Sequence, residues 1–125
     1  MSGESILIVE DEGLIALHLS ELLENAGYRI ADPVFSGEES IRQIRTSRPD
    51  IVLMDIALAG QMDGIEAARQ IRREHDIPVI FLSAYSDQSR IDEAQEVSPY
   101  GYIIKPVMDD RLLALIANAL AQRGS

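Results

Sequence analysis

The chain has 125 residues and no cysteine, 46% of its residues are hydrophobic, and its formal net charge at pH 7 is −10. A chain of this length forms one domain, here taken as residues 1–125, that buries roughly two-thirds of the surface exposed by the unfolded chain. The lack of cysteine excludes disulfides, thiol catalysis and cysteine-based zinc sites, and the negative charge argues against direct binding to nucleic acid. No apolar stretch approaches the ~20 residues of a membrane span and no leader-like segment is present, so we expect a cytoplasmic protein with no membrane partner.

The first part of the chain predicts a strand, a helix and a weaker strand. The apolar run Ser5–Val9 predicts a buried strand. Apolar residues then recur at helical spacing over Leu14–Ala26, and Gly27 follows where a left-handed backbone commonly ends a helix. The mixed segment Tyr28–Val34 contains Pro33, which favours a strand at the edge of a sheet.

Capping signals mark where the next two helices begin. Ser36 and Glu39 have the spacing of a capping box, so we expect a helix from there to about Ser47. Asp63 and Glu66 repeat that spacing further along. The remaining predicted elements are a strand at Ile51–Met54, a helix at Gly64–Glu74, a strand at Val79–Leu82, a short helix at Asp87–Val97, a strand at Tyr102–Ile104 and a last helix at Met108–Gln122.

Alternating strands and helices with short connections predict an α/β fold, a doubly wound five-stranded parallel sheet with five helices covering both faces. The carboxyl ends of all strands in such a sheet meet at one edge, where ligands bind. Polar residues follow four of the predicted strands. That edge would gather Glu10, Asp11, Glu12, Asp55, Ser83 and Lys105.

Carboxylates that lie close together repel one another unless a cation separates them. A hard divalent ion such as Mg²⁺ takes one or two carboxylates, waters and a phosphate oxygen, so Asp11 and Asp55 suit it, with Glu10 as an outer or water-mediated ligand. A carboxylate can also attack phosphorus and form an aspartyl phosphate, whose charged oxygens need a cation and a hydrogen-bond donor. Lys105 would supply the cation and Ser83 the donor.

Each of these residues also has a purely structural interpretation. Acidic residues after the first strand can stabilise the start of a helix through its dipole, and Asp55 can cap a turn. Ser83 can begin a turn, and Lys105 can lead the last strand into solvent. Four such coincidences at one sheet edge are less plausible than one shared site.

The ordered set of these motifs resembles the receiver domain of two-component response regulators, the CheY-like superfamily, over essentially the full chain. The matching segments are ILIVEDE (6–12), PDIVLMD (49–55), MDG (62–64), IPVIFLSA (77–84) and YIIKP (102–106). The resemblance implies a flavodoxin-like fold with strand order 2-1-3-4-5. It also implies that the chain is a phosphoprotein of a two-component phosphorelay. Such a protein is not an enzyme in the usual sense, because it catalyses only its own phosphoryl transfer and dephosphorylation.

The resemblance assigns a role to individual residues. Asp55 would accept a phosphoryl group from a histidine kinase or a histidine phosphotransfer protein. The ligands of Mg²⁺ (or Mn²⁺) would be Asp11, Asp55 and the backbone carbonyl of Ala57, with Glu10 as the second member of the acidic pair. The phosphoryl-binding and switch residues would be Ser83, Ala84, Lys105 and the aromatic Tyr102, and the bond before Pro106 would be cis.

One loop departs from the pattern of this family. Many relatives have Pro four residues after the phosphoacceptor and the glycine of MDG eight after it. Here Ala59 occupies the first position and Gly64 lies nine residues after Asp55, so the loop contains one extra residue. We therefore expect the loop beside the metal site to have a different shape.

Three readings of function remain. In the first, phosphorylation switches the surface formed by the segments 87–97, 102–104 and 108–122 toward a downstream protein or a tethered output domain, with homodimerisation possible. In the second, the chain is a receiver-like interaction module that is not phosphorylated. In the third, the least favoured, the chain is a metal-dependent phosphohydrolase; the haloacid-dehalogenase type would need an Asp at position 57, where this chain has Ala57. Flavin binding by a receiver-like module is disfavoured because the loop after the first strand is acidic.

Overall fold

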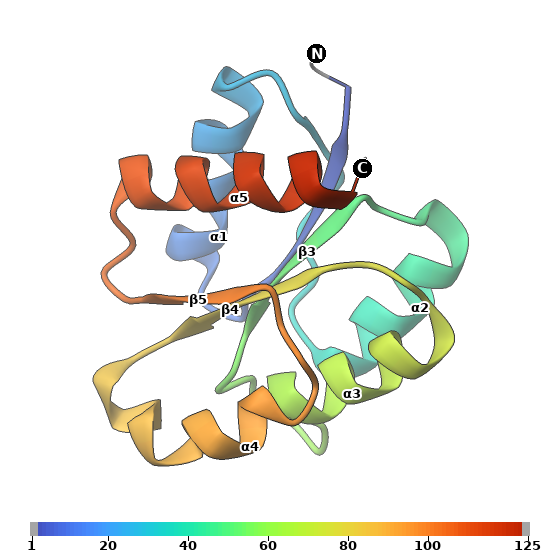
Figure 1. Ribbon diagram of the computed structural model, residues 1–125, viewed down its shortest axis with the longest axis vertical. Helices are drawn as coiled ribbons and strands as arrows, with labels where there is room; N and C mark the ends of the chain where they lie inside the picture. Colours follow the sequence, from blue (N-terminus) through green and yellow to red (C-terminus); the bar gives the residue numbers. More distant parts are fainter. Residues whose placement is uncertain (1–2, 124–125) are drawn as a thin grey trace.

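The computed structural model describes residues 3–123 and has a five-stranded parallel sheet between two layers of helices (Figure 1). Within residues 3–123 every helix is too short or too polar to cross a lipid bilayer. The strands are β1 (Ser5–Val9), β2 (Arg29–Ile30), β3 (Ile51–Asp55), β4 (Val79–Ser83) and β5 (Gly101–Ile104), in the order β2-β1-β3-β4-β5. The helices are α1 (Gly13–Asn25), α2 (Gly37–Ser47), α3 (Gly64–Glu74), the 3₁₀ helix η1 (Tyr85–Arg90), α4 (Ile91–Gln95) and α5 (Asp109–Arg123).

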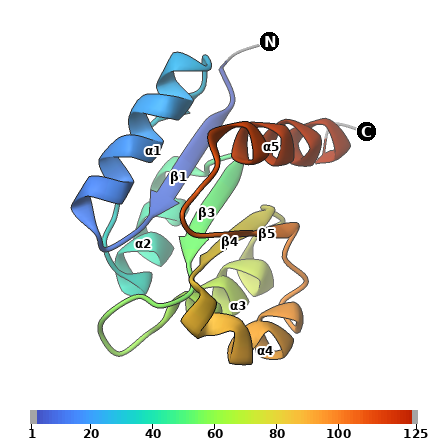
Figure 2. The same ribbon diagram turned by 90° about the vertical axis from the view of Figure 1, so that its left-hand side faces the viewer.

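The helices α1 and α5 cover one face of the sheet, and α2, α3 and α4 cover the other (Figures 1 and 2). Successive strand residues point to opposite faces, so β1 contributes Ile6 and Ile8 to one apolar cluster and Leu7 and Val9 to the other. Both clusters are buried, which explains why the central strands are continuous apolar runs without alternation.

The predicted helix boundaries are confirmed by their caps. The N–H of Glu39 donates to the Ser36 hydroxyl at 3.1 Å, and the N–H of Glu66 donates to the Asp63 carboxylate at 2.9 Å. Gly27 follows α1 with a φ of 102°, a left-handed conformation that glycine adopts without steric cost.

Two predicted elements differ from the expectation, one in length and one in type of helix. The segment Tyr28–Val34 forms only the two-residue β2, because Pro33 has no N–H to donate to a neighbouring strand. Beyond β2 the chain separates from β1, and it returns at Val34, which pairs with Val9 as an isolated bridge. The helix expected at Asp87–Val97 is divided into η1 and α4. The Asp87 carboxylate accepts the N–H of Ala84 at 2.8 Å, which tightens the first turns into a 3₁₀ helix.

The strand register brings the polar residues together. Val9 is paired with Met54, so the next residues, Glu10 and Asp55, lie at the same level of the sheet. Ser83 is paired with Ile104, so Lys105 lies just beyond the end of β4. The carboxyl ends of β1, β3, β4 and β5 therefore form one edge, hereafter the site edge.

Candidate functional site

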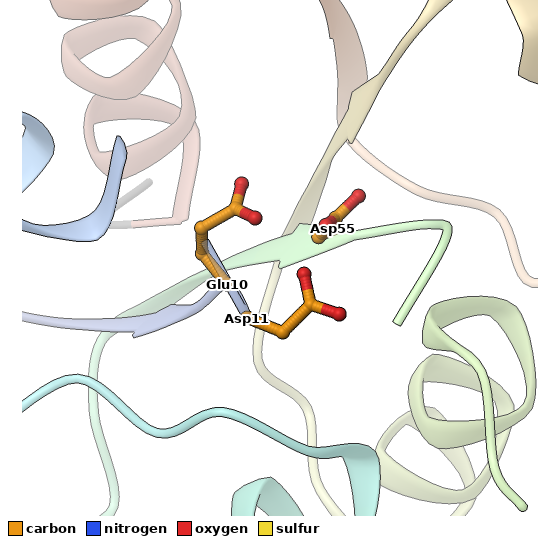
Figure 3. Close-up of side chains that lie close together, drawn as sticks. All are labelled: Glu10, Asp11 and Asp55. Atoms are coloured by element: carbon orange, nitrogen blue, oxygen red, sulfur yellow. The ribbon is translucent and has the colours of Figure 1, made fainter. Parts of the chain in front are cut away.

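Three carboxylates converge at the site edge. Glu10 and Asp11 follow β1, Asp55 ends β3, and Figure 3 shows their side chains around a common space. One oxygen from each lies within 4.8 Å of the others. Glu10 and Asp55 are buried and Asp11 is half-buried, so the group is shielded from bulk water on one side.

Lys105 lies against two of these carboxylates. Its Nζ is 3.0 Å from Glu10 Oε1 and 3.4 Å from Asp55 Oδ2. Burial alone would lower the pKa of Lys105, but the carboxylates of Glu10 and Asp55 outweigh it and raise the pKa above its ordinary value. The ammonium therefore stays charged, and the Lys105–Pro106 bond is cis as expected.

The Glu10 carboxyl is the most perturbed acid at this edge. Burial and the neighbouring Asp55 raise its pKa to about 7, although Lys105 acts in the opposite direction. Its Oε2 accepts the N–H of Glu12 at 3.1 Å. Like charges and desolvation both favour the neutral acid, so this cluster is short of positive charge near neutral pH.

The acidic residues after β1 do not cap α1 with their side chains. Glu12 is the N-cap residue and its carboxylate makes no capping hydrogen bond. The carboxylate of Asp11 accepts instead from the N–H of Ala59, in the loop after β3. Side-chain capping of α1 therefore does not account for Asp11, whose carboxylate is held by a loop far away in the sequence.

Ser83 ends β4 as a buried residue whose hydroxyl has no hydrogen-bond partner among the described residues. Its backbone carbonyl accepts the N–H of Lys105 at 2.7 Å, which fixes the start of the segment that carries the ammonium. Buried polar groups are normally paired. A free hydroxyl at this edge is therefore a donor available to a group that enters the site.

Tyr102 lies in β5, one strand further from Asp55 than Ser83 does. Its ring stacks on Phe81 of β4 with the ring centroids 6.1 Å apart, and burial raises the pKa of its phenol. The hydroxyl is buried and unpartnered within residues 3–123. Tyr102 is thus packed between β4 and the helical layer of α3 and α4. Gln95 of α4 lies near enough to the hydroxyl to act on the phenol pKa in the direction opposite to burial.

The loop between β3 and α3 closes the site from the side. The N–H of Ala57 donates to Asp55 Oδ1 at 3.1 Å, and the N–H of Ala59 donates to Asp11 Oδ2 at 3.0 Å. Gly64, the first residue of α3, packs directly on the Asp55 carbonyl, and a Cβ there would overlap that oxygen. The glycine of MDG is therefore needed for α3 to begin at this place.

Sequence reasoning missed two of these contacts. The Ala59 N–H is a backbone donor, so its side chain gives no signal of it. Arg90 of η1 pairs with the Asp63 carboxylate at 2.6 Å and ties α3 to the η1–α4 segment. Although burial acts in the opposite direction, the Glu66 N–H and the Arg90 guanidinium lower the pKa of Asp63.

The residues present fit a magnesium ion. Oxygen ligands are what Mg²⁺ prefers, and it usually takes one or two carboxylates and keeps several waters. Three convergent carboxylates beside a single ammonium leave net negative charge that a divalent cation would neutralise.

Comparison with known proteins agrees with this arrangement. The model of the response regulator receiver domain family matches residues 6–117. The chain is 30% identical over 89% of its length to chemotaxis protein CheY from Thermotoga maritima, covering 92% of that protein. It is 32% identical to the transcriptional regulatory protein PdtaR from Mycobacterium tuberculosis, covering 94% of this chain and 57% of that one.

A solved structure is similar over nearly the whole chain. The signal receiver domain of a modulated diguanylate cyclase from Desulfovibrio desulfuricans matches with a TM-score of 0.90 and 38% identity, covering 96% of this chain and 95% of that one. The chain spans little more than half the length of PdtaR and of AfsQ1 from Streptomyces coelicolor, 57% and 52%. The chain belongs to the response regulator receiver domains, the phosphoacceptor domains of two-component signalling.

Proposed function

We propose that Asp55 is the phosphoacceptor and that a histidine kinase or a histidine phosphotransfer protein is the donor. The observation that carries the proposal is the position of the Asp55 carboxylate, buried at a strand end, with Lys105 Nζ 3.4 Å from Oδ2 and two further acids beside it. An Asp55 oxygen would attack phosphorus while the phosphorus–nitrogen bond of the donor breaks. The electron pair of that bond returns to the imidazole.

The residues around Asp55 divide the work of this transfer. Asp11, Asp55 and the carbonyl of Ala57 would hold Mg²⁺, which when bound offsets the charge of the transferred oxygens. Lys105 would place its ammonium on one phosphoryl oxygen. The unpartnered Ser83 hydroxyl lies at the end of the neighbouring strand, where it could donate to another phosphoryl oxygen. The N–H of Ala84 would join it only by leaving the Asp87 carboxylate, to which it donates at 2.8 Å.

Phosphorylation would then change the surface formed by η1–α4, β5 and α5. If Ser83 turns toward the phosphoryl group, it vacates space into which the ring of Tyr102 could turn. The phosphoryl group shifts this equilibrium only by interacting more favourably with one of the two states. We propose that the switched surface controls a downstream protein or a tethered output domain. Because similar proteins are named transcriptional regulators, we place this exchange in the cytoplasm.

The test is to incubate the chain with Mg²⁺ and acetyl phosphate and to measure its intact mass. We expect one added phosphoryl group on the wild type and none on Asp55→Asn, which keeps the size of the side chain. A wild type that gains no mass, or an Asp55→Asn variant that gains it equally, would disprove the assignment. The chain would then act as an interaction module that is not phosphorylated.

A second variant separates phosphoryl binding from metal binding. We expect Lys105→Ala to weaken the effect of phosphorylation on the η1–α4, β5 and α5 surface, read by NMR shifts, more than it weakens Mg²⁺ affinity. Asp11→Ala is the control, since it removes a proposed ligand. An equal loss of Mg²⁺ affinity in the two variants would contradict the role given to Lys105.

A further inference from the structure

The loop from Ile56 to Asp63 has a fixed path although it carries an extra residue. Leu58 is 6% exposed and belongs to the apolar cluster under α2, α3 and α4, and Met62 packs against the same cluster. Between them Gly60 makes the turn with a φ of 103°. Figure 2 shows the loop passing from the end of β3 around to the start of α3. Both sides of its tip are therefore held by apolar burial.

This path presents a backbone donor to the metal site. The N–H of Ala59 donates to Asp11 Oδ2 at 3.0 Å, across 48 residues of sequence. It is the one hydrogen bond that the Asp11 side chain makes within the described residues. A proline at position 59 could not make it because proline has no N–H. The contact therefore depends on a residue other than proline at this position.

The hydrogen bond and a bound cation need not compete. A carboxylate has two oxygens and about four acceptor positions, so with Oδ2 held by Ala59 the other oxygen stays available to a cation. Glu10 is arranged in a similar way, with Oε2 on the Glu12 N–H and Oε1 toward Lys105. In both acids a backbone N–H fixes the orientation of the carboxylate.

We propose that the Ala59 N–H is a positioning group that orients Asp11 as a ligand of Mg²⁺, an inference that rests on the function proposed above. Groups that hold metal ligands in place typically change metal affinity by about 10- to 100-fold when they are removed. The Asp11 carboxylate is half-exposed and the loop is near the surface, so we expect the lower end of that range.

The experiment compares Ala59→Pro, which deletes the donor, with Ala59→Ser, which keeps the N–H and has a similar size. The dissociation constant of Mg²⁺ is measured by isothermal titration calorimetry on the whole chain. We expect affinity to fall about tenfold in Ala59→Pro and to stay within about twofold of the wild type in Ala59→Ser. An Ala59→Pro variant that binds Mg²⁺ as tightly as the wild type, or more tightly, would overturn the proposal.

A measurement on the unmodified loop guards against a proline that misfolds it. Amide hydrogen exchange by NMR should show a protected Ala59 N–H in the wild type, both without and with saturating Mg²⁺. In Asp11→Ala the Ala59 amide should exchange at least about tenfold faster, because the exchange rate is proportional to the population of the state in which this hydrogen bond is open. Loss of protection on adding Mg²⁺ to the wild type would show that the cation displaces the contact and would overturn the proposal.

The two proposals fail in different ways. If the wild type binds no Mg²⁺ and gains no phosphoryl group, the proposed function is wrong and this inference falls with it. If the wild type does both and Ala59→Pro binds Mg²⁺ normally while its amide exchange pattern elsewhere is unchanged, only the role of Ala59 is wrong.

Discussion

The two edges of the sheet differ in how their polar groups are paired. At the edge where the strands begin, the Asp50 carboxylate accepts the N–H of Ser5 at 2.8 Å, and Arg45 binds both oxygens of Glu74 at 3.0 Å. At the site edge three carboxylates converge, and Lys105 contacts only two of them. The Ser83 hydroxyl there is buried without a partner among the described residues. The first edge is electrostatically satisfied and the second is not.

The difference separates groups that stabilise the fold from groups kept for a ligand. An unpaired buried polar group lowers stability, so the free Ser83 hydroxyl beside the crowded carboxylates indicates that the site edge is completed by something outside the chain. Departures from local consistency of this kind are expected at functional sites. The following predictions test whether the two edges differ energetically as they do structurally.

The largest effect is expected at Gly64. A Cβ there would overlap the Asp55 carbonyl oxygen, which is backbone and cannot move aside. We expect Gly64→Ala to lower the free energy of unfolding by about 3 kcal/mol or more. Urea denaturation followed by circular dichroism measures it.

Gly13→Ala is the matched control, because nothing lies within 4 Å of a Cβ at Gly13 in the first turn of α1. There alanine should stabilise the helix by up to about 1 kcal/mol. Equal effects of the two substitutions would contradict the close packing of α3 on β3.

The two edges should respond oppositely to pH. The pKa of Glu10 is about 7 in the folded protein and about 4.5 without the fold, so between these values the folded state holds the proton more tightly. Without Mg²⁺ the contribution of Glu10 to the free energy of unfolding should therefore decrease as pH rises from about 4.5 to 7, by on the order of 2 kcal/mol. Urea denaturation in EDTA at several pH values measures it, with Glu10→Gln removing the dependence.

Glu74, at the opposite edge, has the reverse sign. The hydrogen bonds from Arg45 lower its pKa below 4.5. The contribution of Glu74 to stability is present above pH 4.5 and is lost as pH falls through the lower pKa that this carboxyl has in the folded protein. Glu74→Gln should therefore change stability near pH 7, and its effect should diminish progressively as the pH falls below 4.5. The comparison fails if both variants alter the pH profile in the same direction.

Deleting a polar group should cost stability at the satisfied edge only. Asp50→Ala leaves the Ser5 N–H without its acceptor, so we expect a loss of about 1 to 2 kcal/mol. Ser83→Ala removes a hydroxyl that has no partner, and its effect should be within about 0.5 kcal/mol of zero. Thermal unfolding of the two variants distinguishes them; a Ser83→Ala variant as unstable as Asp50→Ala would show that the hydroxyl is paired after all.

A small loss of stability is expected when the ion pair between Asp63 and Arg90 is broken. Asp63→Asn keeps the oxygen that caps α3 and loses only the charge opposite Arg90. Both side chains are about one-third exposed, 31% and 32%, so solvent screens the pair and we expect a loss of about 0.5 to 1 kcal/mol. Asp63→Ala removes the cap as well and should lose about 1 kcal/mol more. Equal losses in the two variants would mean that the cap contributes nothing.

Much of the fold could be predicted because its signals are local. Capping residues such as Ser36 and Asp63 act within one helical turn, and a continuous apolar run such as 51–54 indicates a strand buried on both faces. Predictions failed where a second local feature overrode the first. Pro33 shortened β2, and the Asp87 side chain turned the start of the fourth helix into η1.

The sequence alone determined which chemical groups are present and which strand end carries each, because strand and helix periodicity are properties of neighbouring residues. Only the tertiary structure decided the distances: Lys105 between Glu10 and Asp55, Gly64 on the Asp55 carbonyl, and the Ala59 N–H on Asp11. These contacts join residues that are far apart along the chain. They depend on strand register and on the path of one loop, which no local preference specifies.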